Sequence, residues 1–395
     1  MADKPLLYIL DDEPQYVSLL MDAIDGEGWE TVAEQSPRRF LTYELPKSFV
    51  LILDLNMPEM DGIEVIRALS EKDLDVRLIL ISGFDARVLH SAQQLAEAHN
   101  IKVINNFTKP VPILELLRML EDVKMTMELD SVPRPYQYQP TVTELQHAIE
   151  HNHLVLHYQP QVDITSGKVQ GVEALVRWNH PVHGMIFPDQ FIEMAEENNL
   201  IMLLTKEVLE MSFKQEQAWR AQGLELKISI NISAQSVNSL LLPEQLKKLT
   251  DIYDVKPERV ILEITESGVM KELTSSLDVL NRLRMKGFSL SIDDFGTGYS
   301  SLTKLYQAPF SELKIDKSFI MQMMKDKEAE AIVKICIMLG HMLGMKLVAE
   351  GVEDKEIYEN LKTLECDIAQ GYYVAKPMPG DDLLLWCQNN QGVFS

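Results

Sequence analysis

The sequence has little of what cross-links extracellular domains or crosses membranes. Its three cysteines, Cys336, Cys366 and Cys387, are widely spaced and form no C-x-x-C pair, which argues against a disulfide framework and a zinc site. It contains no apolar run of about eighteen residues and no signal-peptide pattern near its start, so we expect neither a membrane span nor an export signal. We therefore predict a cytoplasmic protein with buried thiols.

Positive charge is also scarce. The chain carries 37 Lys and Arg against 60 Asp and Glu, a formal charge of -23. Nonspecific binding to DNA or to anionic lipid depends on clustered Lys and Arg, so we expect neither DNA nor a membrane as a partner. With 395 residues, of which 46% are hydrophobic and 25% charged, the chain has the length and composition of two ordinary globular domains.

Residues 1–128 show short apolar strands that alternate with amphipathic helices. Strands are expected at 6–10, 50–53, 78–81 and 102–104. Helices are expected between them, for example at 17–27 and 63–70. This order is typical of a doubly wound α/β domain with a parallel sheet.

Polar side chains follow each of these strands. Asp11 and Asp12 follow the first, Asp54 the second, Ser82 the third and Lys109 the fourth. Because the carboxyl ends of parallel strands meet at one edge of the sheet, these groups are expected to share one pocket. The acids suit Mg²⁺, which prefers oxygen ligands, while Ser82 and Lys109 can bind an added phosphoryl group.

On these residues the first domain resembles a two-component receiver domain, with Asp54 inside the motif Leu53-Asp54-Leu55-Asn56-Met57-Pro58. The resemblance implies a flavodoxin-like fold, a cis peptide between Lys109 and Pro110, and Asp54 as the acceptor of a phosphoryl group from a histidine kinase. Receivers usually carry Tyr or Phe three residues before the lysine, as a rotameric switch. Here that position is Asn106, and Phe107 follows it. The alternative is a docking domain whose solvated acids are not phosphorylated.

A linker is expected between the two domains. An amphipathic helix at 111–129 leads into residues 129–140, which hold three prolines and no hydrophobic period. Such a segment forms a short and rather stiff connection, and the helix before it would couple the domains mechanically. The second domain, residues 141–395, begins at Thr141, whose hydroxyl can cap a helix at 142–150.

Eight strand-like segments are expected in the second domain, ending at Tyr158, Arg177, Ile232, Ile264, Ile292, Ile315, Ala349 and Val374. Most are followed by helical stretches, including 188–197 and 205–222. About 250 residues of such alternation match a TIM-like (β/α)8 barrel. Acids or amides stand near several strand ends, namely Glu173, Asn231, Glu263, Asp293, Asp294, Asp316 and Glu350. A carboxylate in an apolar strand is costly unless it is paired or holds a metal, so a site at one face of the barrel is expected.

Over residues 141–390 the second domain resembles the EAL family of cyclic di-GMP phosphodiesterases. The resemblance rests on eight ordered motifs, among them Tyr158-Gln159-Pro160, Glu173-Ala174-Leu175-Val176-Arg177-Trp178, Glu263-Ile264-Thr265-Glu266, Lys314-Ile315-Asp316 and Gln370-Gly371-Tyr372. It implies hydrolysis of cyclic di-GMP to linear pGpG, two Mg²⁺ or Mn²⁺ ions in the site, and a homo-oligomer. With the first domain, it implies a response regulator controlled by phosphorylation of Asp54.

The resemblance also implies roles for single residues. The first ion would be held by Glu173, Asn231, Glu263 and Asp293, and Asp294 would reach the second. Glu350 would act as general base, while Lys314 would hold the attacking water or balance developing charge. The substrate would be bound by Arg177, Gln159, Asp316 and Gln370. Glu266 would anchor a loop rich in Gly and Ser at 295–302, which can move.

Other interpretations stay open at this point. Asp316, Glu353 and Lys314 could make salt bridges at the barrel rim instead. The second domain could be a catalytically inactive receptor for cyclic di-GMP, or the whole chain an interaction adaptor. Inactive members would lack ligands or the base, and none of the expected residues is missing here, which favours the enzyme.

Overall fold

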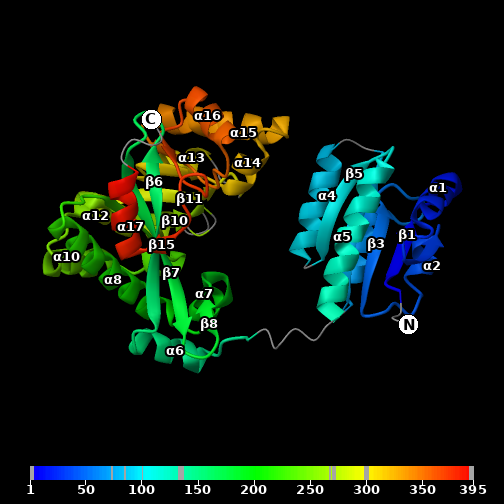
Figure 1. Ribbon diagram of the computed structural model, residues 1–395, viewed down its shortest axis with the longest axis horizontal. Coiled ribbons are helices and arrows are strands. Elements are labelled where there is room, and N and C mark those ends of the chain that lie inside the picture. The colour runs from blue at the N-terminus through cyan, green and yellow to red at the C-terminus, as the bar shows by residue number, and fades with distance from the viewer. Residues whose placement is uncertain are drawn as a thin grey trace. The chain divides into compact units, whose positions relative to one another are not determined.

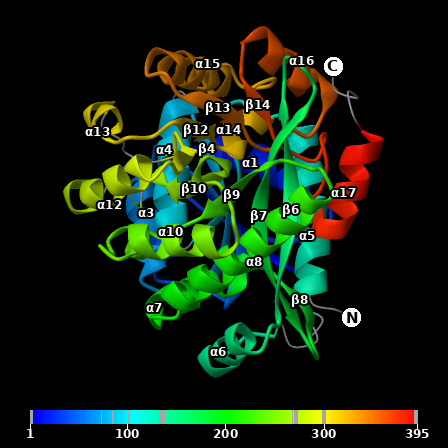
Figure 2. The ribbon, with the colours of Figure 1, turned by 90° about the vertical axis from the view of Figure 1, so that its left-hand side faces the viewer.

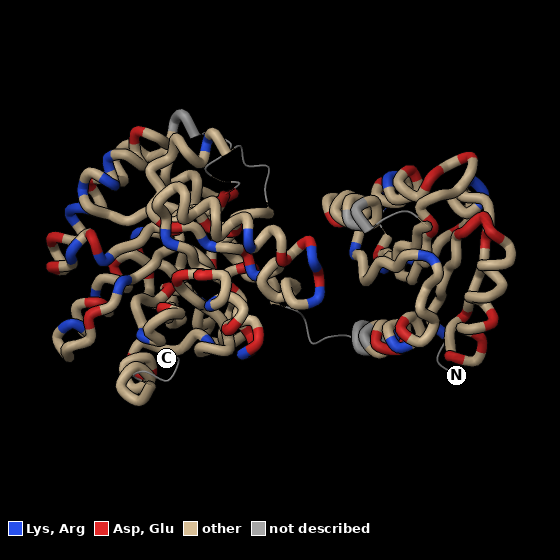
Figure 3. The backbone as a smooth tube through the Cα atoms, turned by 90° about the horizontal axis from the view of Figure 1, so that it is seen from above, with Lys and Arg blue, Asp and Glu red and all other residues tan. Residues whose placement is uncertain are grey.

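The computed structural model describes residues 4–72, 74–83, 86–99, 101–131, 138–266, 268, 273–297 and 302–390. The chain divides into two compact units, Met1–Gln137 and Tyr138–Ser395 (Figure 1). Figure 3 shows acidic residues (red) spread over both units. Within the described ranges there is no helix with both the length and the apolar character needed to span a bilayer.

The first unit is a doubly wound domain, as predicted. Its parallel strands are β1 Leu6–Leu10, β2 Glu30–Glu34, β3 Ser48–Asp54, β4 Asp75–Ser82 and β5 Lys102–Thr108, in the order β2-β1-β3-β4-β5. Its helices are α1 Pro14–Ile24, α2 Pro37–Phe40, α3 Gly62–Ser70, α4 Ala86–Ala98 and α5 Ile113–Ser131. Separate apolar cores include Val65 and Leu89 from α3 and α4 in one, and Leu20 and Leu116 from α1 and α5 in the other. The sheet therefore has a core on each face.

In this unit the sequence prediction missed one strand and ended one helix too early. Strand β2 was not predicted, because it is an edge strand with a glutamate at each end and only its last residue is buried. Helix α5 begins at Ile113, just after Pro112, and continues to Ser131, which lies inside the segment predicted as linker.

The second unit is a closed barrel of eight strands. They are β6 Leu154–Asp163, β7 Val169–His180, β9 Lys227–Asn231, β10 Val260–Thr265, β11 Ser289–Phe295, β12 Glu312–Ile315, β13 Lys346–Ala349 and β14 Ile368–Ala369. The chain of pairings β6-β14-β13-β12-β11-β10-β9-β7 is closed by the pairing of β6 with β7. Two short strands pair with the barrel in antiparallel direction: β8 Gly184–Ile186 pairs with β7, and β15 Met378–Pro379 pairs with β6.

One strand departs from the all-parallel barrel. Strand β6 runs antiparallel to both of its barrel neighbours, β7 and β14. Only five residues, 164–168, connect β6 to β7, and this is far too short for the crossover that a parallel pair requires. The antiparallel pairing places Gln159 opposite Glu173 and Gln161 opposite Gly171.

Helices cover the outside of the barrel (Figure 2). They are α6 Val142–Glu150, α7 Ile192–Glu197, α8 Ile201–Ala221, α9 Ala234–Val237, α10 Leu242–Ile252, α12 Leu273–Met285, α13 Leu302–Gln307, α14 Lys317–Gln322, α15 Lys327–Met342, α16 Lys355–Thr363 and α17 Gly380–Asn389. Thr141 caps α6 with a capping box, as the sequence indicated.

Two details of the prediction are wrong. The helix expected at 188–197 is a 3-10 turn, Pro188–Gln190, followed by α7, because the backbone of Phe191 is not helical. The last strand does not reach Val374. It ends at Ala369, and residues 371–374 form a turn whose backbone hydrogen bonds join Val374 to Gly371 and Tyr373 to Val352.

Candidate active site

Lys314 lies at the centre of an acidic cluster in the barrel. Its side chain is fully buried, and its Nζ lies 2.8 Å from Glu263 Oε2, 3.1 Å from Asp293 Oδ1 and 2.6 Å from Glu350 Oε1. Glu173 Oε2 is 3.6 Å away. These residues come from strands β7, β10, β11 and β12 and from the residue after β13. The salt bridges of Lys314 thus lie inside the barrel and not at its rim.

The charges in this cluster shift one another's pKa. Burial lowers the pKa of Lys314, but the surrounding carboxylates outweigh burial and hold it well above its ordinary value. Burial raises the pKa of Glu350 to about 8, although Lys314 opposes the rise. Burial is also the main reason that the pKa of Glu263 is well above its usual range. A single ammonium therefore does not compensate all the carboxylates, and the site favours further positive charge.

Asp293 and Asp294 are consecutive, yet both face the same pocket. Neighbouring residues of a regular strand point to opposite faces. Here the pairing register of β11 shifts between Ile292 and Phe295, and Asp294 has a φ of 54°, in the left-handed region. Carboxylate oxygens of Asp293, Asp294 and Glu350 all lie within 4.8 Å of one another. Burial and the charge of Asp293 raise the pKa of Asp294 to about 6.

The donor set fits a hard divalent cation. Three carboxylates converge at Asp293, Asp294 and Glu350, and oxygen ligands of this kind suit Mg²⁺ and Mn²⁺. On the other side of Lys314, Glu263 Oε1 is buried with no hydrogen-bond partner. Asn231 donates its Nδ2 to Glu173 Oε1 at 2.7 Å, which leaves the amide oxygen of Asn231 available as a ligand.

Glu173 is held by amides on two sides. Besides the bond from Asn231, Gln370 Nε2 donates to Glu173 Oε2 at 2.5 Å and to Gln159 Oε1 at 3.1 Å. Gln159 Nε2 in turn donates to the carbonyl of Ala375 at 3.1 Å. Burial raises the pKa of Glu173, but Lys314 and these amides more than offset it, so that the net shift is downward.

Gln161 was missed by the sequence analysis. Its Nε2 donates to Gln370 Oε1 at 2.9 Å, which extends the chain of amides by one member. The signal that could have found it is its spacing from Gln159, because residues two apart on a strand share a face.

Arg177 and Asp316 lie at the borders of the acidic cluster. The guanidinium of Arg177 stacks on the ring of Phe187, 5.2 Å from its centroid, and donates to the carbonyl of Val176 at 2.8 Å. Asp316 caps helix α14, accepting from the backbone N–H of Ser318 at 2.9 Å and from the Ser318 hydroxyl. This capping role was not predicted, and no salt bridge of Asp316 occurs among the described residues.

Glu266 is joined to the segment after β11. Its Oε2 accepts the backbone N–H of Gly296 at 2.8 Å. Gly296 has a φ of 105° and an added Cβ would meet the Phe319 ring at 2.9 Å, so a larger residue does not fit there. Residues 298–301 of the predicted loop lie outside the described residues.

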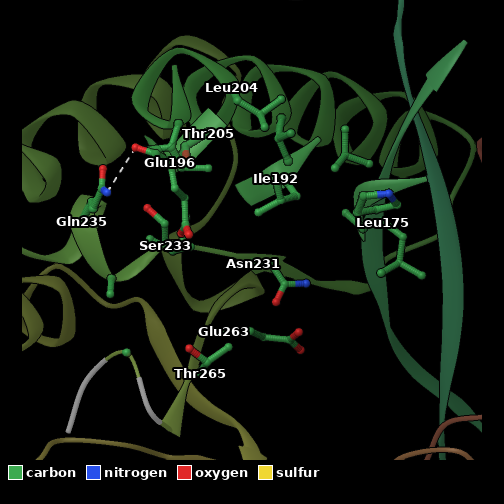
Figure 4. Close-up of a pocket in the computed structure, with 18 of the residues that line it drawn as sticks. Leu175, Ile192, Glu196, Leu204, Thr205, Asn231, Ser233, Gln235, Glu263 and Thr265 are labelled. Carbon is green, nitrogen blue, oxygen red and sulfur yellow. Dashed lines mark hydrogen bonds between the residues drawn. The ribbon is translucent and has the colours of Figure 1, made fainter. Parts of the chain in front are cut away.

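A cavity of about 630 Å³ opens beside the acids, between α7, α8 and strands β7, β9 and β10. Asn231 and Glu263 line it where it meets the acidic cluster, and apolar side chains such as Leu175, Ile192 and Leu204 line the opposite side (Figure 4). Its volume and largely apolar lining are typical of a small-molecule site.

The first unit brings its predicted pocket together as well. Lys109 Nζ lies 2.8 Å from Asp54 Oδ2, 2.8 Å from Asp11 Oδ2 and 2.9 Å from Glu13 Oε1. Carboxylate oxygens of Asp11, Asp12 and Asp54 lie within 4.8 Å of one another, and Ser82 is buried at the end of β4. Burial raises the pKa of Asp54 even though Lys109 opposes it. The Lys109–Pro110 peptide is cis, as the resemblance implies.

The aromatic residue near this pocket is not placed as a switch. Phe107 is buried in the core between the sheet and helices α1 and α5. The switch position holds Asn106, whose Nδ2 donates to Gln93 Oε1 of α4 at 2.8 Å. Gln93 donates to Glu97 at 2.8 Å. Strand β5 is therefore joined to α4 by a hydrogen bond between two amides instead of by an aromatic ring.

Both units of the chain match known protein families. Residues 142–377 match the family model described as EAL domain, and residues 7–121 match the response regulator receiver domain. Cyclic di-GMP phosphodiesterase RocR of Pseudomonas aeruginosa is 31% identical over 343 residues, 86% of this chain and 87% of RocR.

A further relative and a solved structure each match 61% of this chain. The bifunctional diguanylate cyclase/cyclic di-GMP phosphodiesterase MucR of Pseudomonas aeruginosa is 42% identical over 242 residues, 61% of this chain but only 35% of MucR. The solved structure of the PaMucR phosphodiesterase in complex with c-di-GMP aligns with a TM-score of 0.59 and 41% identity, over 61% of this chain and 98% of that one.

The first unit is a doubly wound sheet with an aspartate pocket, and the second is a barrel with acids at its strand ends. This is the class of proteins in which a receiver domain is joined to a barrel domain with an acidic site. The chain belongs to the EAL domain family and carries an N-terminal response regulator receiver domain.

Proposed function

We propose that this chain is a cyclic di-GMP phosphodiesterase that opens the cyclic dinucleotide to linear pGpG and is regulated by phosphorylation of Asp54. The observation that carries the proposal is the complete acidic site, with Lys314 among four carboxylates and three acids converging at Asp293, Asp294 and Glu350. It is supported by the names of RocR and MucR as phosphodiesterases.

The residues of the site can divide the work of hydrolysis. Two divalent cations, when bound by Glu173, Asn231, Glu263, Asp293 and Asp294, would supply an acidified water and polarise the phosphate. Glu350, which lies 2.6 Å from Lys314 and close to Asp293 and Asp294, would accept the proton of the attacking water. Lys314, in contact with Glu350 and Asp293, balances the charge that develops next to them. The scissile P–O3′ bond breaks as the new P–O bond forms, which leaves a 5′-phosphate and a free 3′-hydroxyl.

The substrate would lie across the mouth of the barrel. Arg177, already oriented by Phe187, suits a phosphate oxygen of the dinucleotide. Gln159, Gln370 and the free carboxylate oxygen of Asp316 would contact the nucleotide. The cavity of about 630 Å³ next to Asn231 and Glu263 is large enough for part of such a ligand.

A chromatographic time course of the purified chain with cyclic di-GMP and Mg²⁺ tests this function. We expect linear pGpG to appear and the cyclic dinucleotide to be consumed. If the dinucleotide stays intact in both Mg²⁺ and Mn²⁺ while it still binds, the chain is a receptor and the proposed activity is wrong.

In the receiver, Mg²⁺ would be held by Asp11, Asp12 and Asp54, and Lys109 and Ser82 would bind the phosphoryl oxygens. A histidine kinase is the partner that this pocket requires.

We also propose that the chain pairs with a second copy. The proposal is supported by large exposed apolar side chains on α13 and α15, among them Tyr306 and Met342, which are 76% and 78% exposed.

Asp54→Asn is expected to abolish the change in phosphodiesterase rate that beryllofluoride or acetyl phosphate causes, because the amide cannot accept a phosphoryl group or its analogue. The measurement is the ratio of initial rates with and without beryllofluoride, which we expect to be about 1 in the variant. Asp22→Asn, an exposed acid on α1, is the matched control and should respond as the unmodified chain does. A full response in Asp54→Asn would place the regulation elsewhere.

A further inference from the structure

Gln161 is buried inside the barrel, and neither the metal ligands nor the substrate contacts proposed above include it. It lies on β6 two residues after Gln159, with 2% of its surface exposed. Opposite it on β7 stands Gly171, and a Cβ there would lie 3.1 Å from Gln161 Oε1. The absence of a side chain at Gly171 leaves room for Gln161 to reach across toward Gln370.

The bond from Gln161 supports one of the two orientations of the Gln370 amide, the one in which its nitrogen faces Glu173. A primary amide has an oxygen that only accepts and a nitrogen that only donates. Gln161 Nε2 donates to Gln370 Oε1 at 2.9 Å. The Nε2 of Gln370 is thereby directed toward Glu173 Oε2, at 2.5 Å, and Gln159 Oε1, at 3.1 Å.

The opposite orientation of Gln370 would harm the site. Turned over, its amide oxygen would face the carboxylate of Glu173 and the Oε1 of Gln159, so that acceptors would face acceptors. Two buried hydrogen bonds would be lost, and buried acceptors without donors are costly. Glu173 would then keep Asn231 as its amide donor, with Lys314 Nζ 3.6 Å from its Oε2.

We propose that Gln161 is a positioning residue for Glu173, acting through the amide of Gln370 to hold the carboxylate in the direction that a bound cation needs. The inference rests on the proposed role of Glu173 as a metal ligand. Partners that orient a metal ligand without touching the metal typically contribute 10- to 100-fold to metal affinity, to order of magnitude.

Three variants separate this role from simple packing. Gln161→Met keeps roughly the length of the side chain but has no donor. Gln161→Glu is nearly the same shape but, when ionised, only accepts, so it favours the turned-over amide of Gln370. Gln161→Lys keeps a donor that can reach the Gln370 oxygen. A donor requirement predicts that the Lys variant stays closest to the unmodified chain, whereas a packing requirement predicts that it is the most disturbed.

The experiment is a calorimetric titration of the full-length chain with Mn²⁺ in the absence of substrate, together with initial rates over a range of Mg²⁺ concentrations. We expect Gln161→Met and Gln161→Glu to weaken metal binding by about 10-fold or more, and Gln161→Lys to recover most of that loss. The receiver is the same in all variants, so differences between them report on the barrel. Rates at saturating Mg²⁺ should differ much less than rates at low Mg²⁺.

Equal Mn²⁺ affinity in all four proteins would overturn the inference, and so would equal losses in Met, Glu and Lys variants that remain folded by thermal melting. Failure of the proposed function would give a different experimental result. If the unmodified chain produced no pGpG, the Mn²⁺ titration would still test Gln161. If the unmodified chain produced pGpG and the Met variant matched it in both measurements, only the inference would fall.

Discussion

Glu350→Ala is expected to retain binding of cyclic di-GMP and to lose nearly all of its turnover. The substitution removes the carboxylate closest to Lys314, 2.6 Å from its Nζ, and with it the proposed acceptor of the water proton. A positioned general base contributes about 10²- to 10⁴-fold to rate, and the loss should fall in that range. Lys314 keeps three other acids around it, so the barrel should remain folded.

The measurement pairs a pGpG time course with calorimetric binding of cyclic di-GMP in Ca²⁺, which should occupy the site without supporting the reaction well. The matched control is Glu356→Ala, an exposed acid in the first turn of α16, which should leave turnover near that of the unmodified chain. Full activity in Glu350→Ala would refute the assignment of the base. Loss of both binding and turnover would assign Glu350 to the metal or substrate site instead.

Glu173→Ala is expected to lose turnover for a different reason, because it should bind the metal ions less tightly. Its carboxylate accepts from Asn231 and Gln370 and lies 3.6 Å from Lys314 Nζ. Removing it takes away a proposed ligand and leaves two amides without their acceptor. Because residues that only orient a ligand already contribute up to about 100-fold, loss of the ligand itself should exceed about 100-fold in rate.

For this variant the decisive quantity is the affinity for Mn²⁺, measured by titration of the folded protein. We expect it to fall together with the rate, whereas in Glu350→Ala the rate should fall much further than the affinity. Glu193→Ala on α7, an exposed acid, serves as the control for loss of one negative charge. Unchanged metal affinity with normal turnover in Glu173→Ala would remove this residue from the ligand set.

The parts of the fold that the sequence predicted are those with strong local signals. Strand Ser48–Asp54 is apolar from Phe49 to Leu53, and a buried central strand needs such a run. Strand β2 was missed because only one face of an edge strand is buried and its pattern is weak. The end of the barrel was placed too far along the chain, at Val374, because apolar residues in the turn after Ala369 pack against the barrel and look like strand residues.

The acids that cluster around Lys314 were expected near strand ends, but their arrangement was not predicted. Nothing in Asp293-Asp294 shows that both carboxylates share one pocket, because that depends on a register shift between two strands and on the positive φ of Asp294. The contact between Gln161 and Gln370 could not be predicted either, since the two residues are 209 positions apart in the chain. Such contacts follow from barrel closure and not from local pattern.

The position of Lys314 affects the stability of the barrel when no metal ions are bound. In a site built from acids alone, the carboxylates would repel one another whenever the cations left. The barrel would then depend on bound cations to stay folded. Here a buried ammonium touches an acid on each side and acts as a permanent internal counter-ion. We therefore expect the barrel to stay folded when Mg²⁺ is removed, so that metal ions would bind and leave without a structural role.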